Sequence, residues 1–347
     1  MFARGGPRPG EKVVRVIHPV PESSSLPASD PARGVRRVAA VDCGTNSIRL
    51  LVADVAADGT LTEVERRTTI VRLGQGVDRT GELAPEALER TFAATREYAR
   101  VVRETGAEKV RFVATSATRD ARNRQVFADG VRAALGVEPE VVSGDEEAAL
   151  SFRGATGAVA VSHPGPYLVA DLGGGSTELV LGESAPQAAF SMDVGSVRMT
   201  ERHLPSDPPT QAEVEAARAD VRAALDEASA VVPLGRATTL VGLAGSVTTI
   251  TAYALGLREY DRSRVDGAVL AVDDVLAACD RLLAMTREER LALGFMQPGR
   301  ADVIGAGALV WSQVVRRVRD EVAAAGGELT GVVTSEHDIL DGIALSV

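Results

Sequence analysis

The segment at residues 168–181, LVADLGGGSTELVL, decides how the rest of the chain is interpreted. It begins as an apolar strand ending in Asp171, turns through the glycines at 173–175 and Ser176, and returns as a strand that carries Glu178. Glycines lack a Cβ, so the N–H groups of such a turn can approach an anion closely. The two carboxylates would repel a bare phosphate, and the pattern therefore favours a phosphate-binding hairpin with a hard cation such as Mg²⁺ beside it. A plain hairpin with a glycine turn remains the alternative for this segment alone.

The same pattern occurs earlier in the chain. Residues 38–52, VAAVDCGTNSIRLLV, align with it without a gap, so that Asp42 matches Asp171 and Ser47 matches Ser176. A repeat of this form predicts two similar halves, each presenting a phosphate hairpin to a shared cleft.

Composition narrows the class of protein. The chain has 347 residues, 45% of them hydrophobic and 25% charged, which is typical of a globular protein with room for two domains. The net charge of −10 argues against a general nucleic-acid binder. The sequence has neither an apolar run of membrane-spanning length nor a signal-peptide core, so we expect a cytoplasmic protein without a membrane partner. Cys43, Cys279 and the four histidines show no disulfide framework and no metal-ligand spacing.

The domain boundaries follow from breaks in the pattern. Residues 1–36 are rich in Pro, Gly, Ser and Arg without periodicity, which predicts a disordered leader. A Pro/Gly break near residues 163–166 separates a first α/β domain at 37–163 from a second at 164–347. The closing segment GVVTSEHDILDGIALSV predicts a strand, the cap Ser335 and a terminal helix that could cross back onto the first domain.

Two further residues are candidates for chemistry. The loop at 115–124, TSATRDARNR, leaves the carboxyl end of a strand, where open α/β sheets bind ligands, and Arg119 is its candidate phosphate clamp. In SGDEEA, Ser143 and Glu146 fit a capping box, which accounts for Glu146. Glu147 then has no structural role and is a candidate general base that aligns a water for attack on phosphorus.

A third glycine turn precedes a helix. In TTLVGLAGSVTTI, a strand is followed by residues 244–246 and a helix, so Gly245 and Ser246 lie where free N–H groups and the helix dipole favour an anion. Close helix packing explains the glycine equally well. A polyanionic substrate also needs a basic lane, for which Arg198, Arg202 and Arg262 are the candidates.

Six segments together resemble one known family: DCGTNSIRLLV, VATSATRDARN, SGDEEA, DLGGGSTELVLG, LAGSVTT and SEHDILDGIAL. They resemble the Ppx/GppA phosphatases, the exopolyphosphatases and guanosine pentaphosphate phosphohydrolases, in consistent order from residue 37 onward. The match looks closest to the short actinobacterial exopolyphosphatase type, which lacks a C-terminal helical HD domain.

The resemblance implies a fold and a set of roles. The fold is α/β, with two ribonuclease-H-like domains of the actin, sugar-kinase and heat-shock-chaperone ATPase superfold around a central cleft. By resemblance, Glu147 is the catalytic base, Arg119 contacts phosphate, and Asp42, Asp171 and Glu178 serve the metal, usually Mg²⁺ with Mn²⁺ possible. The implied phosphate-binding residues are Gly44, Thr45, Asn46, Ser47, Gly173, Gly174, Gly175 and Ser176, with Gly245 and Ser246 as a further contact. Family members are commonly homodimers.

The expected reaction is hydrolysis of the terminal phosphoanhydride of inorganic polyphosphate, with short chains favoured and orthophosphate released. The first alternative is a pppGpp 5′-phosphohydrolase that uses the same centre on a nucleotide. A small-molecule kinase is disfavoured because such kinases have no counterpart of Glu147. A non-catalytic nucleotide or polyphosphate sensor is disfavoured because it needs no water-activating base.

Overall fold

The computed structural model describes residues 34–347, so all but the last three residues of the predicted leader lie outside it. Strand β1 already begins at Arg36, one residue before the predicted start of the first domain. None of the helices in the described part combines the length and apolar character that a membrane crossing requires.

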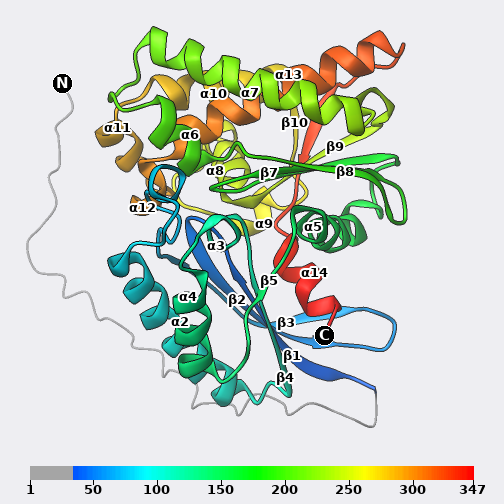
Figure 1. The fold of residues 1–347 in the computed structure, drawn as a ribbon. Coiled ribbons are helices and arrows are strands. Elements are labelled where there is room, and N and C mark those ends of the chain that lie inside the picture. The colour runs from blue at the N-terminus through cyan, green and yellow to red at the C-terminus, as the bar shows by residue number, and fades with distance from the viewer. Residues whose placement is uncertain (1–33) are drawn as a thin grey trace, which may run out of the picture.

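Two sheets form the centres of the two halves (Figure 1). The first has the order β3-β2-β1-β4-β5, and the second has the order β8-β7-β6-β9-β11 with β10 added at its edge. In both, the first three strands of the half form an antiparallel meander and the later central strands run parallel to the first. The strands are β1 (Arg36–Cys43), β2 (Ser47–Val55), β3 (Leu61–Ile70), β4 (Lys109–Ala114), β5 (Glu140–Val141), β6 (Tyr167–Leu172), β7 (Thr177–Gly182), β8 (Pro186–Met192), β9 (Thr239–Leu243), β10 (Val269–Ala271) and β11 (Gly331–Thr334). The repeat seen in the sequence is therefore a repeat of topology.

Helices cover both faces of the sheets, which is why β1 and β6 are almost continuously apolar and buried. Helices α2 and α4 pack against the first sheet, and α13 with its buried Trp311 lies in the large core of the second half. The helices are α1 (Val77–Thr80), α2 (Pro85–Thr105), α3 (Ser116–Asp120), α4 (Arg124–Leu135), α5 (Gly144–Val159), α6 (Ser196–His203), α7 (Gln211–Val231), α8 (Ala244–Ala254), α9 (Arg262–Val265), α10 (Val272–Ala284), α11 (Arg287–Leu291), α12 (Pro298–Ala301), α13 (Ile304–Ala324) and α14 (Ile339–Leu345).

Two helices cross between the halves. Helix α5 follows the first sheet in sequence, yet its Phe152 packs with Val169 and Val180 of the second sheet. Helix α14 ends the chain and packs its Leu340 and Ile343 against β1 and β2. The two helices also contact each other beside the cleft (Figure 1). This crossed pair ties the two halves together on one side of the molecule.

The terminal helix begins later than predicted. Ser335 was the expected cap, but α14 starts at Ile339 and the carboxylate of Asp338 accepts from the N–H of Leu340. Ser335 instead makes hydrogen bonds to the backbone of His337. The predicted cap was wrong because a loop of SEHD lies between the strand and the helix, and it brings Asp338 to the cleft.

The predicted capping box at α5 forms only in part. The Ser143 hydroxyl accepts from the N–H of Glu146 at 3.2 Å, as expected of an N-cap. The Glu146 carboxylate does not return to the cap and pairs with Arg111 at 2.8 Å. Glu146 thus has a surface structural role, and Glu147 is the buried member of the pair.

Candidate active site

The two phosphate-type hairpins meet at one cavity of about 200 Å³ between the halves. Most of the predicted site residues line this cavity: Asp42, Gly44, Thr45, Asn46, Ser47, Glu147, Asp171, Gly173, Gly174, Ser176, Glu178, Gly245 and Ser246. Gly175 lies just behind it, where an added Cβ would come within 2.7 Å of the hydroxyls of Thr45 and Ser116. Predicted residues from four separate segments therefore meet at one place.

Both hairpins close with the same hydrogen bond. The N–H of Gly44 donates to the carbonyl of Ser47 at 2.9 Å, and the N–H of Gly173 donates to the carbonyl of Ser176 at 3.0 Å. In the second turn, the first residues of α6 donate to the carbonyls of Gly173 and Gly174. Because C=O and N–H point in opposite directions across a trans peptide, the following N–H groups point away from α6. The turn is thus held in a form that can present N–H groups to an anion.

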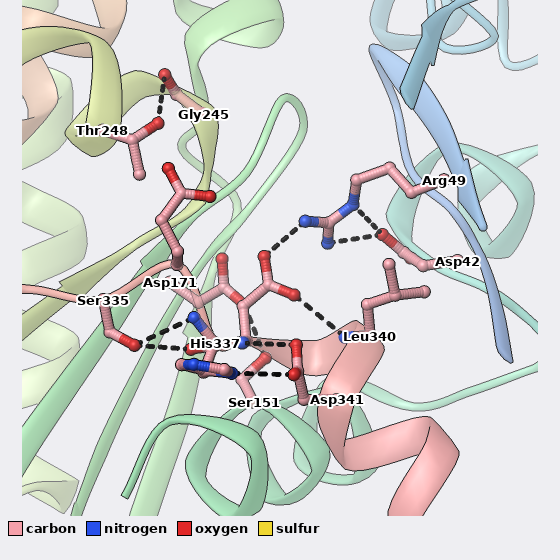
Figure 2. Close-up of polar contacts among 12 residues, drawn as sticks. Asp42, Arg49, Ser151, Asp171, Gly245, Thr248, Ser335, His337, Leu340 and Asp341 are labelled. Atoms are coloured by element: carbon pink, nitrogen blue, oxygen red, sulfur yellow. Dashed lines mark hydrogen bonds and ion pairs between the residues drawn. The ribbon is translucent and has the colours of Figure 1, made fainter. Parts of the chain in front are cut away.

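The hairpins differ in the residue opposite the aspartate. Asp171 on β6 pairs in register with Glu178 on β7, whereas Asp42 on β1 pairs with Arg49 on β2. Arg49 donates to Asp42 at 2.7 and 2.9 Å, as Figure 2 shows, and also pairs with Asp338. The first aspartate is neutralised within its own hairpin. The second faces a like charge, an arrangement that is unfavourable without a cation.

Burial raises the pKa of both aspartates, but Arg49 opposes the rise at Asp42 and Glu178 adds to it at Asp171. Burial, followed by the charge of Glu178, raises the pKa of Asp171 to about 7. Burial also raises the pKa of Glu178, although it accepts a 2.7 Å bond from Ser191. Asp171 accepts a bond of 2.5 Å from Ser151 on α5. A divalent cation would relieve the repulsion between these two carboxylates.

Mg²⁺ fits this donor set. Within residues 34–347 no three acidic, histidine or cysteine side chains form a ready-made ligand group. Mg²⁺ is commonly bound through one or two carboxylates, with waters and substrate phosphate oxygens completing its shell. Asp171 and Glu178 can supply the two carboxylates. The metal role of Asp42 stays a prediction and has less support, because Arg49 already neutralises it.

Glu147 and Arg119 form the second functional pair. Glu147 lies in the first turn of α5, is 8% exposed, and accepts a bond of 3.0 Å from Nη1 of Arg119. Burial and the charge of Glu178 raise the pKa of Glu147 well above its usual value, and Arg119 opposes them. Arg119 also donates to the Val142 carbonyl, so it reaches the site through Glu147. A buried carboxylate with a raised pKa is suited to accept a proton from water.

The third glycine turn also lies at the cavity. Helix α8 begins at Ala244, whose φ of 68° places a non-glycine residue in the left-handed region. Arg300 covers Gly245 so closely that an added Cβ would lie 2.3 Å from its Nη2. The guanidinium and the first turn of α8 together make this end of the cavity suited to an anion. Gly245 and Thr248 are drawn in Figure 2.

The sequence reasoning missed several lining residues and misplaced the basic lane. Arg198, Arg202 and Arg262 do not line the cavity and pair with carboxylates instead. The lining contains the missed residues Arg49, Thr68, Thr115, Ser116, Tyr260, Arg300, Glu336 and Asp338. One of them left a signal in the sequence: the gapless repeat places Arg49 at the position of Glu178.

The strand order and the two facing turns define the class of protein. It is an α/β protein with two ribonuclease-H-like halves of the actin, sugar-kinase and heat-shock-chaperone ATPase superfold, as predicted. The chain belongs to the Ppx/GppA phosphatase family, whose pattern matches residues 51–334.

Individual relatives support this assignment. The chain is 53% identical over 319 residues to Exopolyphosphatase 2 of Mycobacterium tuberculosis (strain ATCC 25618 / H37Rv), covering 90% of this chain and 98% of the relative. A crystal structure of an exopolyphosphatase-like protein superposes with a TM-score of 0.88 at 52% identity, covering 90% of this chain and 98% of that chain. A shorter match, 35% over 167 residues, is to the guanosine-5′-triphosphate,3′-diphosphate pyrophosphatase of Vibrio atlanticus (strain LGP32), covering 48% of this chain and 33% of the relative.

Proposed function

We propose that the protein is an exopolyphosphatase that hydrolyses the terminal phosphoanhydride of inorganic polyphosphate and releases orthophosphate. The observation that carries this proposal is the buried Glu147 in a cavity shared by two phosphate-type turns and the Asp171–Glu178 pair. The name of the Mycobacterium tuberculosis relative agrees with it.

Asp171 and Glu178 would hold Mg²⁺, with Mn²⁺ as a substitute, and the ion would neutralise charge on the end phosphate. The N–H groups and hydroxyls of the two turns, Gly44–Ser47 and Gly173–Ser176, bind and orient the phosphate oxygens. Glu147 aligns a water in line with the scissile bond and takes up its proton at a carboxylate oxygen. Arg119 holds that carboxylate in place. A direct contact between Arg119 and phosphate is part of the proposal by resemblance to the family.

The size of the cavity favours short substrates. Its volume is about 200 Å³, which a short chain can fill, whereas most of a long chain would lie outside it. Ion pairs elsewhere join the two halves, among them Arg262 with Glu63 and Arg72 with Asp302. We also propose a cytoplasmic location, from the sequence, and a homodimer, by resemblance to the family.

A pppGpp 5′-phosphohydrolase is the second candidate. The Vibrio atlanticus relative is named for a nucleotide with that phosphate pattern. The α8 end of the cavity offers Arg300 and the aromatic ring of Tyr260, which suit the remainder of a nucleotide. The same centre would remove the end phosphate of either substrate.

Orthophosphate release tests the proposal. The purified protein is given short polyphosphate, long polyphosphate, pppGpp and ATP side by side, with Mg²⁺ and with a chelator. We expect metal-dependent release, fastest from short polyphosphate. Release from pppGpp alone would favour the second candidate, and binding of polyphosphate without any release would favour the sensor.

A further inference from the structure

Arg198 joins three elements on the side of the cleft away from the crossed helices. Its Nε donates to the carbonyl of Gly175 at 2.7 Å, its Nη1 to Asp78 at 2.7 Å, and its Nη2 to Asp120 at 2.5 Å. The side chain is only 13% exposed. Gly175 belongs to the second hairpin, whereas Asp78 and Asp120 belong to α1 and α3 of the first half. One guanidinium therefore spans both halves.

Two of these partners, Asp120 and Gly175, are directly bonded in the chain to residues of the candidate active site. Asp120 directly follows Arg119 on α3, so holding Asp120 fixes the position from which Arg119 reaches Glu147. The Gly175 carbonyl belongs to the same planar peptide as the N–H of Ser176. Fixing that carbonyl therefore fixes the direction of the N–H of Ser176, a residue that lines the cavity.

The contacts of Arg198 with Asp78 and Asp120 form only when the halves are together, whereas its bond to Gly175 lies within the second half. Its helix, α6, sits against the first half near α3, while α5 and α14 meet on the other side (Figure 1). On the same helix, Glu201 accepts from the N–H of Gly76, and Arg202 pairs with Asp78 at 2.9 Å. Arg202 also pairs with Asp220 and touches neither Gly175 nor Asp120 among the described contacts. Arg202 thus shares the contact with Asp78 but makes neither of the contacts that lead to the active site.

We infer that Arg198 is a positioning residue: bonded to the second phosphate hairpin at Gly175, it holds Asp120 when the two halves are together and so sets the Arg119–Glu147 pair relative to that hairpin. The inference rests on the proposed function. It adds that the contact between the two halves at Arg198 aligns the catalytic groups. Charge-assisted bonds from one rigid guanidinium suit this role, because Nε and both Nη groups are used in fixed geometry. A lysine has a single ammonium and cannot reproduce that geometry.

The test compares Arg198→Gln with Arg202→Gln, which loses the same Asp78 contact. We expect Arg198→Gln to lower kcat about 10- to 100-fold with KM changed less than about threefold, because misplacing catalytic groups by about 1 Å has effects of that size. Asp120→Asn should also lower kcat, whereas Arg202→Gln should leave kcat unchanged. In Arg198→Ala, added guanidinium ion at tens of millimolar should restore part of kcat, while sodium at the same ionic strength should not.

Equal kcat in Arg198→Gln and Arg202→Gln would overturn the inference, as would a loss of kcat explained fully by a lower melting temperature. If Arg198→Gln does not fold, Arg198→Lys is used instead, and we expect the same loss of kcat. If the wild type releases no orthophosphate from any substrate, the proposed function fails, and hydrogen exchange then tests the link by itself. Amides of residues 116–120 and 173–177 should exchange faster in Arg198→Gln than in Arg202→Gln, and equal exchange would refute it.

Discussion

Asp171 on β6 lies directly across the strand pair from Glu178 on β7, at the position where the other hairpin sets Asp42 against Arg49. One hairpin thus carries its own positive charge, and the other does not, which is why we propose that Mg²⁺ binds there. Glu178→Gln should therefore raise the Mg²⁺ concentration for half-maximal activity by about 10-fold or more, because it removes a charged ligand. A magnesium titration of orthophosphate release measures this.

Glu183→Gln provides the matched control for Glu178, because Glu183 is an exposed carboxylate just beyond the same strand. Its magnesium titration should coincide with that of the wild type. A titration of Glu178→Gln that also coincides with the wild type would remove Glu178 from the metal site.

The raised pKa of Asp171 makes a prediction about stability and pH. Burial and Glu178 raise its pKa from 3.8 to about 7 in the folded protein. Because the folded value lies above the unfolded one, the protonated form stabilises the fold below pH 4, and that contribution is lost as the pH rises to about 7. Without divalent metal, its full loss corresponds to about 4 kcal/mol.

The Asp171→Asn variant has no carboxyl group at this position, so this pH dependence of stability should be absent from it. Urea unfolding in chelator at several pH values should show Asp171→Asn gaining stability relative to the wild type up to about pH 7, with a constant difference above it. Added Mg²⁺ near pH 8 should stabilise the wild type more than the variant. A difference between the two proteins that does not change with pH would show that Asp171 titrates normally.

Glu147→Gln tests the proposed base. Loss of the proton acceptor with almost no change in volume should lower kcat about 10²- to 10⁴-fold and leave KM nearly unchanged. Glu146→Gln is the control on the neighbouring residue, whose carboxylate is 47% exposed and pairs with Arg111. Steady-state kinetics on short polyphosphate measure both variants. Similar turnover in both would mean that another group activates the water.

The residues that the sequence could predict are those whose roles are local. The glycine turns and the strands on either side of them are short contiguous patterns, so the repeat was enough to give both hairpins and a shared cleft. Glu147 followed because the neighbouring Glu146 had another explanation, and the structure buries only Glu147. The third turn was also local, and Gly245 lies at the cavity.

The residues that were missed depend on contacts between distant segments. Arg300 reaches Gly245 from α12, and Ser151 reaches Asp171 from α5, so no local pattern links them. The sequence predicts Arg198 as part of a basic lane because it shows the charge of Arg198 but not its pairing with two carboxylates far away in the sequence. The sequence predicts that the terminal helix α14 crosses to the first half, but it does not predict that α5 covers the second sheet. Periodicity shows which face of a helix is apolar, not which sheet that face covers.

The crossed helices meet at Gly154, and this contact leads to the last prediction. An added Cβ on Gly154 would lie 1.8 Å from the carbonyl oxygen of Asp338 and 2.9 Å from the N–H nitrogen of Gly342, so backbone of α14 would have to move. Gly154→Ala should lower the free energy of unfolding by about 1–3 kcal/mol despite the better helix propensity of alanine. Gly157→Ala lies on the same helix with nothing within 4 Å of its Cβ, and should raise that free energy by about 0.5–1 kcal/mol. Urea unfolding of the two variants should thus give shifts of opposite sign. Equal shifts would mean that α14 can move away from α5 at little cost, and that the contact at Gly154 does not hold the halves together.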